Sequence, residues 1–263
     1  MEEVEKIAEI IQNLRTSSKM TKSNLQMKKE ERHLRNLYNC PICCDTGFIP
    51  TEDENGYVVY RYCKCREMAR VEKIWKDSGI SINDIDKSFK NFKNWNMEIE
   101  NMRDRATNYY YRFNTIRDER SNSIMMCGNP GCGKTHLAIA LANNLIQNKQ
   151  ISVIYMPYRD VVIKLKQNII DEEAYKKIIS KYKLAEVLLI DDLFKGKINE
   201  TDINIIFELI NYRYLNRLPL IISTEFTVDK LLEFDEAVGS RIYEMCKGFI
   251  TEIRGTENNY RLK

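Results

Sequence analysis

Gly128-Asn-Pro-Gly-Cys-Gly-Lys134-Thr135 is the stretch that decides the fold of this chain, because it matches the pattern G-x-x-x-x-G-K-[ST] at every fixed position. Ser123 to Cys127 before it predict a short buried strand, and His136 to Leu145 after it predict a helix with an apolar face. A glycine-rich turn between a strand and a helix points backbone N–H groups at phosphate oxygens, and the helix N-terminus adds partial positive charge. The stretch therefore predicts a binding site for a nucleoside triphosphate.

Two residues of this loop have a defined chemistry in the pattern. Lys134 is expected to reach the β- and γ-phosphates of ATP, and the Thr135 hydroxyl is expected to bind Mg²⁺. A chance match in a glycine-containing turn is the alternative, and the flanking strand and helix argue against it. The predicted nucleotide contacts come from Gly128, Asn129, Pro130, Gly131, Cys132, Gly133, Lys134, Thr135 and His136.

The composition predicts a cytoplasmic chain that does not enter a membrane. The chain has 263 residues, of which 30% are charged, and its acidic, amphipathic N-terminus MEEVEKIAEI is unlike a secretory signal. No apolar run approaches the length of a membrane-spanning helix. The net charge of +3 does not indicate nucleic-acid binding by itself, so such a contact must come from a local group of residues.

Five of the eight cysteines lie between Cys40 and Cys65, which in a cytosolic chain favours a metal site over disulfides. Asn55-Gly56 followed by Tyr-Val-Val-Tyr-Arg-Tyr predicts a hairpin that brings two cysteine pairs together. Four thiolates close the coordination sphere of Zn²⁺, so the predicted site is structural, with Cys44 as the substitute ligand. The predicted zinc ligands are Cys40, Cys43, Cys63 and Cys65.

The remaining chain divides into three parts. Residues 1–37 show helical periodicity and predict a hairpin of two helices, packed either on its own domain or against a partner. We expect residues 1–70 to form an N-terminal helical and zinc-binding domain, residues 71–97 a linker, and residues 98–263 an ATPase domain. For the aromatic residues of the linker, which include Phe92, two interpretations are open: packing in the core, or lying over the adenine.

From residue 122 strands and helices alternate, which predicts a parallel sheet covered on both faces. The fold class is therefore α/β, with five parallel strands between helices. The predicted strands cover residues 122–127, 151–156, 186–191, 218–224 and 248–253, and the predicted helices lie near 134–148, 158–168, 172–183, 201–216, 227–233 and 236–247.

Val187-Leu-Leu-Ile-Asp191-Asp192 runs from four apolar residues into two carboxylates. Because strand C-termini line the ligand crevice of a parallel sheet, Asp191 is predicted to bind Mg²⁺ beside Thr135, and Asp192 to polarise the attacking water. Aspartate is shorter than the glutamate common in such ATPases, so we expect slow, switch-like hydrolysis of ATP to ADP and phosphate. Arg241, on a predicted helix, is a candidate to reach a nucleotide in a neighbouring subunit. An ordinary surface arginine is the alternative.

These motifs together resemble the AAA+ ATPases of the DnaC/DnaI-type replicative helicase loaders of phages and Gram-positive bacteria. The resemblance rests on CPIC…CKC, Ser88-Phe-Lys-Asn-Phe92, GNPGCGKTHLAIALAN, LLIDDL and GSRIYEMC, and it spans roughly residues 40–263. It implies that Arg241 is an arginine finger acting in trans and that Arg261 is the second sensor arginine. The first sensor position, commonly Asn, falls here on Thr224 or Glu225. A carboxylate there repels the γ-phosphate unless it points away or pairs with a cation.

The resemblance also implies an open nucleotide pocket and a DNA contact. Only ten residues follow the last predicted strand, so the helical lid of most AAA+ proteins does not fit, and weak nucleotide binding by the monomer is expected. In the family, loops near the strand that here ends in Asp191-Asp192 contact single-stranded DNA. A solvated loop without a DNA contact is the alternative for this chain. The corresponding residues are Phe194, Lys195, Lys197 and Asn199.

The function predicted from this resemblance is ATP-dependent loading of a hexameric replicative helicase onto single-stranded DNA during replication initiation, by a protein that forms a homo-oligomer with ATP. The cofactors are then ATP, Mg²⁺ and Zn²⁺. Three alternatives remain: an IstB-like transposition helper ATPase, an antagonist that sequesters the helicase, and a small-molecule kinase. The missing lid and the position of Arg241 argue against the kinase.

Overall fold

The computed structural model describes residues 38–262. The predicted hairpin of helices in residues 1–37 lies outside the described residues. The chain separates into two units, Met1–Lys73 and Ile74–Lys263, and helix α3 (Lys64–Ser78) runs from the first into the second. Each unit is described by itself below.

The described part of the first unit is built on an antiparallel hairpin of β1 (Phe48–Glu52) and β2 (Val58–Tyr62). The turn between them follows the predicted Asn-Gly sequence: the Gly56 N–H donates to the carbonyl oxygen of Asp53 at 3.0 Å. Gly56 has a φ of 80°, a left-handed conformation that a glycine adopts without strain. The hairpin predicted from the sequence is therefore present.

A five-stranded parallel sheet forms the centre of the second unit, as the alternation of apolar segments predicts. The strand order is β4-β5-β6-β3-β7, so the glycine-rich loop follows a strand with neighbours on both sides. Every residue of β3 and β6 is buried, because helices cover both faces of the sheet. The strands are β3 (Ile124–Gly128), β4 (Val153–Pro157), β5 (Val187–Leu193), β6 (Leu220–Thr224) and β7 (Ile250–Ile253).

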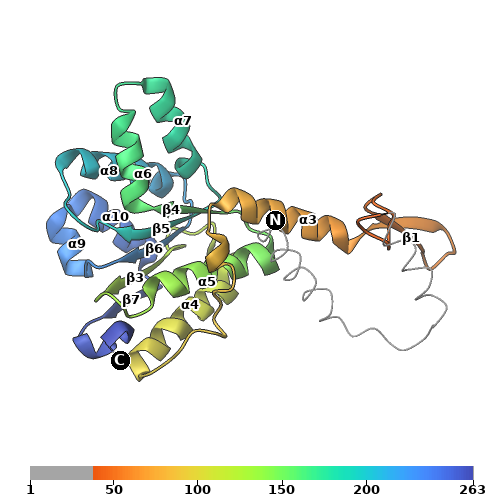
Figure 1. Cartoon of the computed structure of the whole chain (residues 1–263), viewed down its shortest axis with the longest axis horizontal. Coiled ribbons are helices and arrows are strands. Elements are labelled where there is room, and N and C mark those ends of the chain that lie inside the picture. The colour runs from red at the N-terminus through yellow and green to blue at the C-terminus, as the bar shows by residue number, and fades with distance from the viewer. Residues whose placement is uncertain (1–37, 263) are drawn as a thin grey trace. The chain divides into compact units, whose positions relative to one another are not determined.

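Helices α4 and α5 cover one face of this sheet, and α6, α8 and α10 lie on the other (Figure 1). Their bounds agree with the predicted ones to within a few residues, and Asn, Asp or Thr side chains cap the N-termini of five of them. The helices are α4 (Met97–Ile116), α5 (Lys134–Lys149), α6 (Tyr158–Gln167), α7 (Glu172–Lys183), α8 (Glu200–Leu215), α9 (Val228–Phe234) and α10 (Glu236–Cys246).

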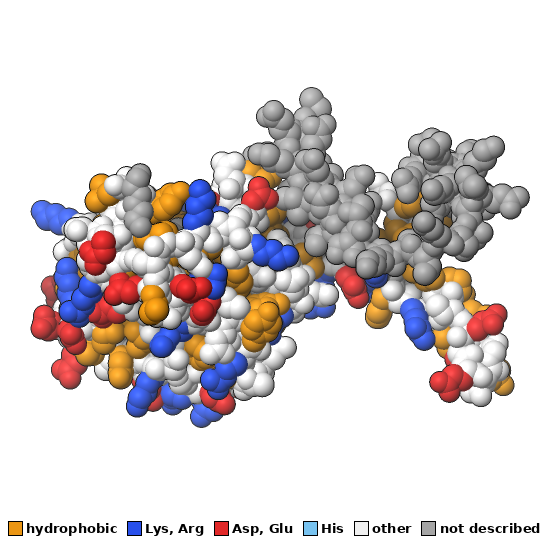
Figure 2. All heavy atoms as spheres, turned by 90° about the horizontal axis from the view of Figure 1, so that it is seen from below, with side chains coloured by type: hydrophobic (Ala, Val, Ile, Leu, Met, Phe, Trp, Pro, Cys, Tyr) orange, Lys and Arg blue, Asp and Glu red, His pale blue; other side chains and the backbone are white. Residues whose placement is uncertain are grey.

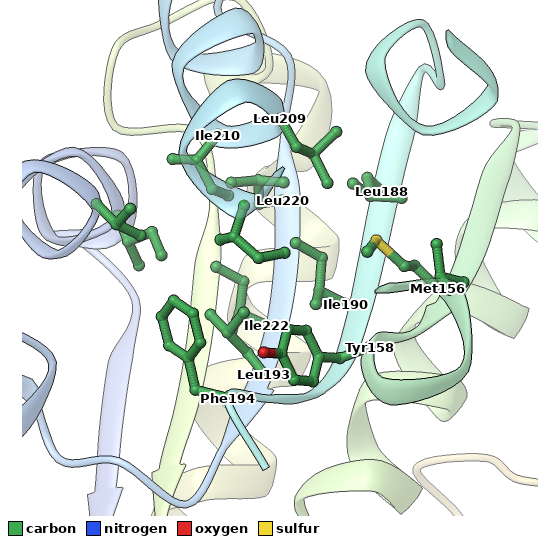
Figure 3. Close-up of a cluster of buried hydrophobic side chains, with 14 of the residues drawn as sticks. Met156, Tyr158, Leu188, Ile190, Leu193, Phe194, Leu209, Ile210, Leu220 and Ile222 are labelled. Carbon is green, nitrogen blue, oxygen red and sulfur yellow. The ribbon is translucent and has the colours of Figure 1, made fainter. Parts of the chain in front are cut away.

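The core between the sheet and α6, α8 and α10 is continuous. Ile190, Leu193 and Phe194 at the end of β5 meet Ile222 of β6 and Tyr158 of α6 (Figure 3). Burying one such side chain stabilises the fold by roughly 1.5–3 kcal/mol relative to exposure. This packing holds the carboxyl ends of β5 and β6, where the predicted acidic residues lie, in fixed positions.

Two irregular segments lie beside α5 and the glycine-rich loop. The first contains a 3-10 helix (Ile82–Asp84) and is attached to α5, because the Asn143 side chain donates to the carbonyl oxygens of Asp84 and Lys87, each at 3.0 Å. The second follows β7 and consists of two 3-10 turns, Thr256–Asn258 and Tyr260–Leu262. Within the described residues after β7 no helical lid occurs, as expected.

Charged side chains of both signs are interspersed over the face of the second unit that Figure 2 shows. This agrees with the small net charge of +3. Among the described residues, no helix is long and apolar enough to cross a membrane.

Candidate functional site

The glycine-rich loop closes around the side chain of Lys134 at the start of α5. Lys134 is only 5% exposed, and its Nζ donates to the carbonyl oxygens of Gly128 at 2.9 Å and Asn129 at 2.7 Å. The ammonium group is thus held at the mouth of the loop, where the N-terminus of α5 adds its own partial positive charge. This is the arrangement that the pattern predicts for a phosphate site.

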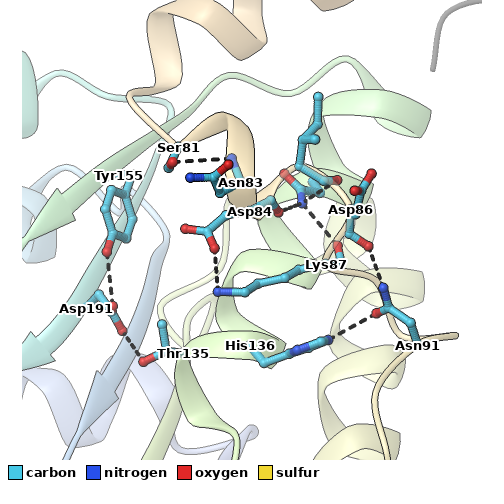
Figure 4. Close-up of polar contacts among 12 residues, drawn as sticks. Ser81, Asn83, Asp84, Asp86, Lys87, Asn91, Thr135, His136, Tyr155 and Asp191 are labelled. Atoms are coloured by element: carbon cyan, nitrogen blue, oxygen red, sulfur yellow. Dashed lines mark hydrogen bonds and ion pairs between the residues drawn. The ribbon is translucent and has the colours of Figure 1, made fainter. Parts of the chain in front are cut away.

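The side chains of Thr135, at the start of α5, and Asp191, near the end of β5, are in contact. The Thr135 hydroxyl donates to Asp191 Oδ1 at 2.8 Å, and Tyr155 Oη donates to Asp191 Oδ2 at 3.1 Å, as Figure 4 shows. Ser223 Oγ also donates to Asp191 Oδ1. A hydroxyl and a carboxylate side by side offer the hard oxygen ligands that Mg²⁺ prefers, so Thr135 and Asp191 fit the predicted metal.

Tyr155 and Ser223 were not predicted from the sequence. Burial, and next the charge of Asp191, raise the pKa of Tyr155, so its hydroxyl keeps its proton and remains a donor. Both residues lie on the strands that flank β5, and the strand order that places them beside Asp191 is not encoded in any local pattern. They orient the carboxylate that faces Thr135.

A cavity of about 560 Å³ opens beside the loop, within the usual size range of small-ligand sites. It brings together residues from five separate stretches of sequence. At the loop it is lined by Pro130, Gly131, Gly133, Lys134, Thr135 and His136, at the strand ends by Asp191, Asp192, Lys195 and Glu225, and elsewhere by Phe92, Trp95, Tyr260 and Arg261.

Aromatic rings form one wall of the cavity. The Phe92 ring lies 5.3 Å from that of His136 and 6.5 Å from that of Trp95, and Trp95 lies 5.3 Å from Tyr260, between ring centroids. A Cβ on Gly133 would lie 2.6 Å from the Phe92 ring, so only glycine allows this approach. Phe92 is buried and also lines the cavity.

His136 belongs to this wall and carries no charge near neutral pH. Burial is the main cause that lowers its pKa, and the nearby Lys87 lowers it further. Its Nε2 lies 3.2 Å from Asn91 Oδ1 and 3.3 Å from the carbonyl oxygen of Ser88 (Figure 4). The imidazole therefore fastens the segment before α4 to the first turn of α5.

The acidic end of the cavity contains a salt bridge that the sequence did not predict. Lys195 Nζ lies 2.8 Å from Asp192 Oδ2 and 3.3 Å from Glu225 Oε1, and the hydrogen bond with Asp192 raises the pKa of Lys195. Lys195 was expected to contact DNA, yet it lines this cavity. Glu225, one of the two residues expected at the first sensor position, also lines the cavity. The Thr224 hydroxyl is buried and donates to the carbonyl oxygen of Leu193 at 2.8 Å instead.

Residues 61–244 match the family described as IstB-like ATP binding protein, which is most of the chain. The chain belongs to this IstB-like ATP-binding family. It is 40% identical over 211 residues to the uncharacterized protein YqaM of Bacillus subtilis (strain 168), covering 77% of this chain and 66% of YqaM. It is 36% identical over 235 residues to the phage-like element PBSX protein XkdC of the same strain, covering 86% of this chain and 87% of XkdC.

Among solved structures, the crystal structure of the DnaC helicase loader has the same fold. It aligns with a TM-score of 0.59 and 24% sequence identity, over 66% of this chain and 99% of the DnaC chain. This likeness confirms the predicted α/β fold, and the match over residues 61–244 places the chain among IstB-like ATP-binding proteins. The IstB-like match begins at residue 61, so it includes only the last part of the cysteine module.

Arg241 lies outside the cavity of this IstB-like domain, on helix α10. Its Nε donates to Asn211 Oδ1 at 3.0 Å, and its guanidinium stacks over the rings of Phe207 and Tyr214 on α8. Arg241 pairs with neither Glu236 nor Glu244, the acidic residues of its own helix, among the ion pairs of the described residues. Arg261 lines the cavity and is exposed.

The predicted DNA-contacting loop differs from expectation at Phe194. The Phe194 side chain is 1% exposed and packs against the rings of Tyr158, Phe226 and Phe234, so it has no free face for a base, and the prediction for this residue is wrong. Its backbone adopts a left-handed φ of 61°. Lys197 and Asn199 are exposed, and the Asn199 side chain caps α8.

The four predicted zinc ligands converge at the base of the hairpin in the first unit. The sulfur atoms of Cys40, Cys43, Cys63 and Cys65 all lie within 4.8 Å of one another. A tetrahedral Zn²⁺ with Zn–S bonds of about 2.3 Å places sulfurs about 3.8 Å apart, so the arrangement fits this ion. Cys44 adopts a φ of 50° and is not part of the cluster. The cluster could therefore hold zinc without the substitute ligand.

Electrostatics within the cluster favour the thiolate of Cys43, whereas burial raises the pKa of Cys63 and of Cys65. The pKa of Cys43 is lowered from its usual value to about 7. Burial raises this pKa, but the hydrogen bonds from the Cys65 thiol and the Gly47 N–H contribute to a larger effect in the opposite direction. A cysteine binds metal as its thiolate, so a lowered pKa makes deprotonation at neutral pH easier.

Proposed function

We propose that the protein is an ATPase that loads a hexameric replicative helicase onto single-stranded DNA. The observation that carries the proposal is the cavity in which Lys134, Thr135 and Asp191 meet, on a fold that matches nearly the whole solved DnaC loader. A loader needs a nucleotide-dependent switch, and this cavity provides the groups for one.

ATP occupies this cavity with its phosphates at the glycine-rich loop. Lys134 binds the β- and γ-phosphates, and Thr135 and Asp191 hold Mg²⁺, which neutralises phosphate charge when bound. Asp192 accepts the proton of the attacking water. Because the aspartate side chain is short, turnover is slow, and a rate above several per second would contradict this step.

The adenine stacks on the aromatic wall formed by Phe92, Trp95 and Tyr260. Aromatic side chains of this kind supply area for a flat ring at a small entropic cost. Arg261, exposed on the same side, acts as the second sensor arginine. The isolated monomer binds nucleotide weakly, because no helical lid covers the cavity in the described residues.

Arg241 completes the cavity of a neighbouring copy. Its stacking on Phe207 and Tyr214 holds the guanidinium on the surface of α8 and α10, where a second protomer can approach it. An arginine delivered in this way stabilises the charge of the transferring phosphoryl group. ATP therefore promotes a homo-oligomer, which assembles around DNA and contacts it through Lys197 and Asn199.

Residues 1–70 dock the helicase. The zinc site at Cys40, Cys43, Cys63 and Cys65 stabilises this part of the chain, because a segment of this size has little core of its own. Its hairpin exposes Tyr57, Tyr60 and Tyr62, which are each at least 66% exposed. Exposed aromatic side chains are common at the centres of protein interfaces.

A transposition helper ATPase is the second candidate, because the family that matches residues 61–244 is described as IstB-like. A helicase-sequestering antagonist is the third, favoured by Asp192 and Glu225 in the cavity. The small-molecule kinase has no observation in its favour.

The test combines partner capture with hydrolysis. The full chain is incubated with a replicative helicase or with double-stranded DNA, with and without ATP, and the masses of the complexes are measured. Capture of the helicase and DNA-stimulated hydrolysis that Lys134→Ala abolishes support the loader. Retention on double-stranded DNA alone favours the transposition helper, and helicase capture without any hydrolysis favours the antagonist.

The role of Arg241 in trans is tested by mixing two inactive variants. Lys134→Ala cannot bind phosphates, and Arg241→Ala cannot complete a neighbour's cavity. A mixture contains interfaces in which an intact cavity faces an intact arginine. Hydrolysis that returns on mixing supports an intersubunit site, and a mixture as inactive as each variant alone contradicts it.

A further inference from the structure

The chain reverses direction in a tight turn directly after β5. The Lys195 N–H donates to the carbonyl oxygen of Asp192 at 3.0 Å, and Asp192 itself has a φ of 56°. The pairing of β5 with β6 is irregular between Ile190 and Leu193. The left-handed conformation is costly for a residue with a side chain, so the surrounding structure must maintain it.

The buried ring of Phe194 anchors this turn in the hydrophobic core. The ring lies 5.0 Å from the Phe234 ring and 5.7 Å from the Tyr158 ring, between centroids. Phe194 packs into the core, whereas the next residue, Lys195, lines the cavity. Within the turn, Asp192 and Lys195 are joined twice, by the backbone hydrogen bond and by the salt bridge between their side chains.

The Lys195 ammonium lies between the carboxylates of Asp192 and Glu225. All three side chains line the cavity together with Lys134 and Thr135. The terminal phosphate of a nucleotide bound at Lys134 and Thr135 would approach two carboxylates here, which repel it. Lys195 is the cation placed to offset that repulsion, and it is 45% exposed, so it can move toward a phosphate.

We propose that Lys195 contacts the terminal phosphate of ATP and thereby takes over the task of a polar residue at the first sensor position, where this chain has Glu225. The proposal rests on the proposed ATPase function. On binding ATP, Lys195 moves from Asp192 toward the phosphate, and the freed carboxylate faces the water. Water then adds to the terminal phosphorus, the bond to ADP breaks, and the proton of the water passes to Asp192. ADP lacks the terminal phosphate, so it leaves Lys195 on the two carboxylates.

The test compares ATP with ADP in the full-length chain. The affinities for ADP and for a non-hydrolysable ATP analogue are measured by calorimetry for the wild type, Lys195→Ala and Lys177→Ala. Lys177 is an exposed lysine of α7, outside the residues that line the cavity. We expect Lys195→Ala to weaken binding of the ATP analogue about tenfold and binding of ADP less than twofold, and Lys177→Ala to change neither.

A second variant separates a phosphate contact from a structural role. Glu225→Gln removes one repelling carboxylate, so Lys195→Ala combined with Glu225→Gln is expected to recover part of the lost affinity for the ATP analogue. Equal weakening of both nucleotides, or weaker DNA binding with an unchanged ratio of the two affinities, would overturn the role of Lys195. A wild type that binds neither nucleotide would overturn the proposed ATPase function itself, and the two failures are therefore distinct.

Discussion

The Tyr260 N–H donates to the carbonyl oxygen of Gly131 at 3.0 Å, which ties the segment after β7 to the glycine-rich loop. The contact is close, because a Cβ on Gly131 would lie 1.9 Å from Asn259 Oδ1. Gly131 also has a φ of 78°, which favours glycine. The 3-10 turn Tyr260–Leu262 thus forms a wall of the cavity, through Tyr260 and Arg261, on a domain without a helical lid in its described residues.

Asn258→Ala is expected to loosen this wall. Asn258 is fully buried, accepts from Asn96 Nδ2 at 2.5 Å and donates to Glu98 Oε2 at 2.6 Å. Removing one partner of a buried hydrogen bond costs about 1–3 kcal/mol of unfolding free energy. We expect that loss in urea unfolding, together with weaker nucleotide binding. Thr256→Ala, at an exposed residue of the same segment, is the control, and equal effects of both variants would contradict the prediction.

Trp95 is expected to report nucleotide binding through its fluorescence. The chain has two tryptophans, and only Trp95 lines the cavity, while Trp75 is buried in α3. A base stacked beside Trp95 changes the surroundings of its ring. Titration with ATP should change the emission of the wild type and of Trp75→Phe. The signal should disappear in Trp95→Phe, and its persistence there would place the nucleotide elsewhere.

Phe194→Ala is expected to lower the unfolding free energy by about 3–5 kcal/mol, the usual cost of removing a buried phenylalanine. The ring is surrounded by Tyr158, Phe226 and Phe234, so the cavity left behind cannot collapse easily. Lys197→Ala, three residues further along and exposed, should leave the unfolding free energy within about 0.5 kcal/mol of wild type. Urea unfolding of both variants measures the difference, and a small effect of Phe194→Ala would mean that the ring is free.

Zinc removal is expected to unfold the hairpin of the first unit and to spare the second. Elemental analysis should find one zinc per chain, and a chelator should make residues near the hairpin sensitive to protease. Cys63→Ser should lose the metal, because its sulfur lies within the cluster, whereas Cys44→Ser should keep it. The heat-induced unfolding of the second unit should be the same in both variants. Full zinc content in Cys63→Ser would refute this ligand set.

The sequence predicts those features that depend on local pattern. The loop that begins at Gly128 has a fixed spacing of glycines, lysine and threonine, and a short apolar run ends at Asp191. These local patterns predict the strands and the helix beside them. The meeting of Thr135 with Asp191 could also be anticipated, since parallel strands end at one edge of the sheet. The cysteine spacing and the Asn-Gly turn similarly predict the cluster.

The remaining features of the site depend on backbone conformations and on neighbouring strands that no local sequence pattern predicts. Asp192 and Phe194 both adopt left-handed φ values, which are uncommon for residues with a side chain. In a segment whose sequence is typical of a solvated loop, Phe194 is buried and Lys195 lines the cavity. Tyr155 and Ser223 reach Asp191 only because β4 and β6 flank β5. Strand order is a long-range property, and no short segment encodes it.

The different accessibilities of the cysteine thiols would allow this protein to be labelled at one position for measurements in an assembly. Cys127, Cys132 and Cys246 are buried in the second unit, and four more thiols form the metal cluster. Cys44 is partly exposed and belongs to neither group. A maleimide dye under metal-replete conditions should therefore attach at Cys44, which would give a single optical label on the first unit without engineering the chain.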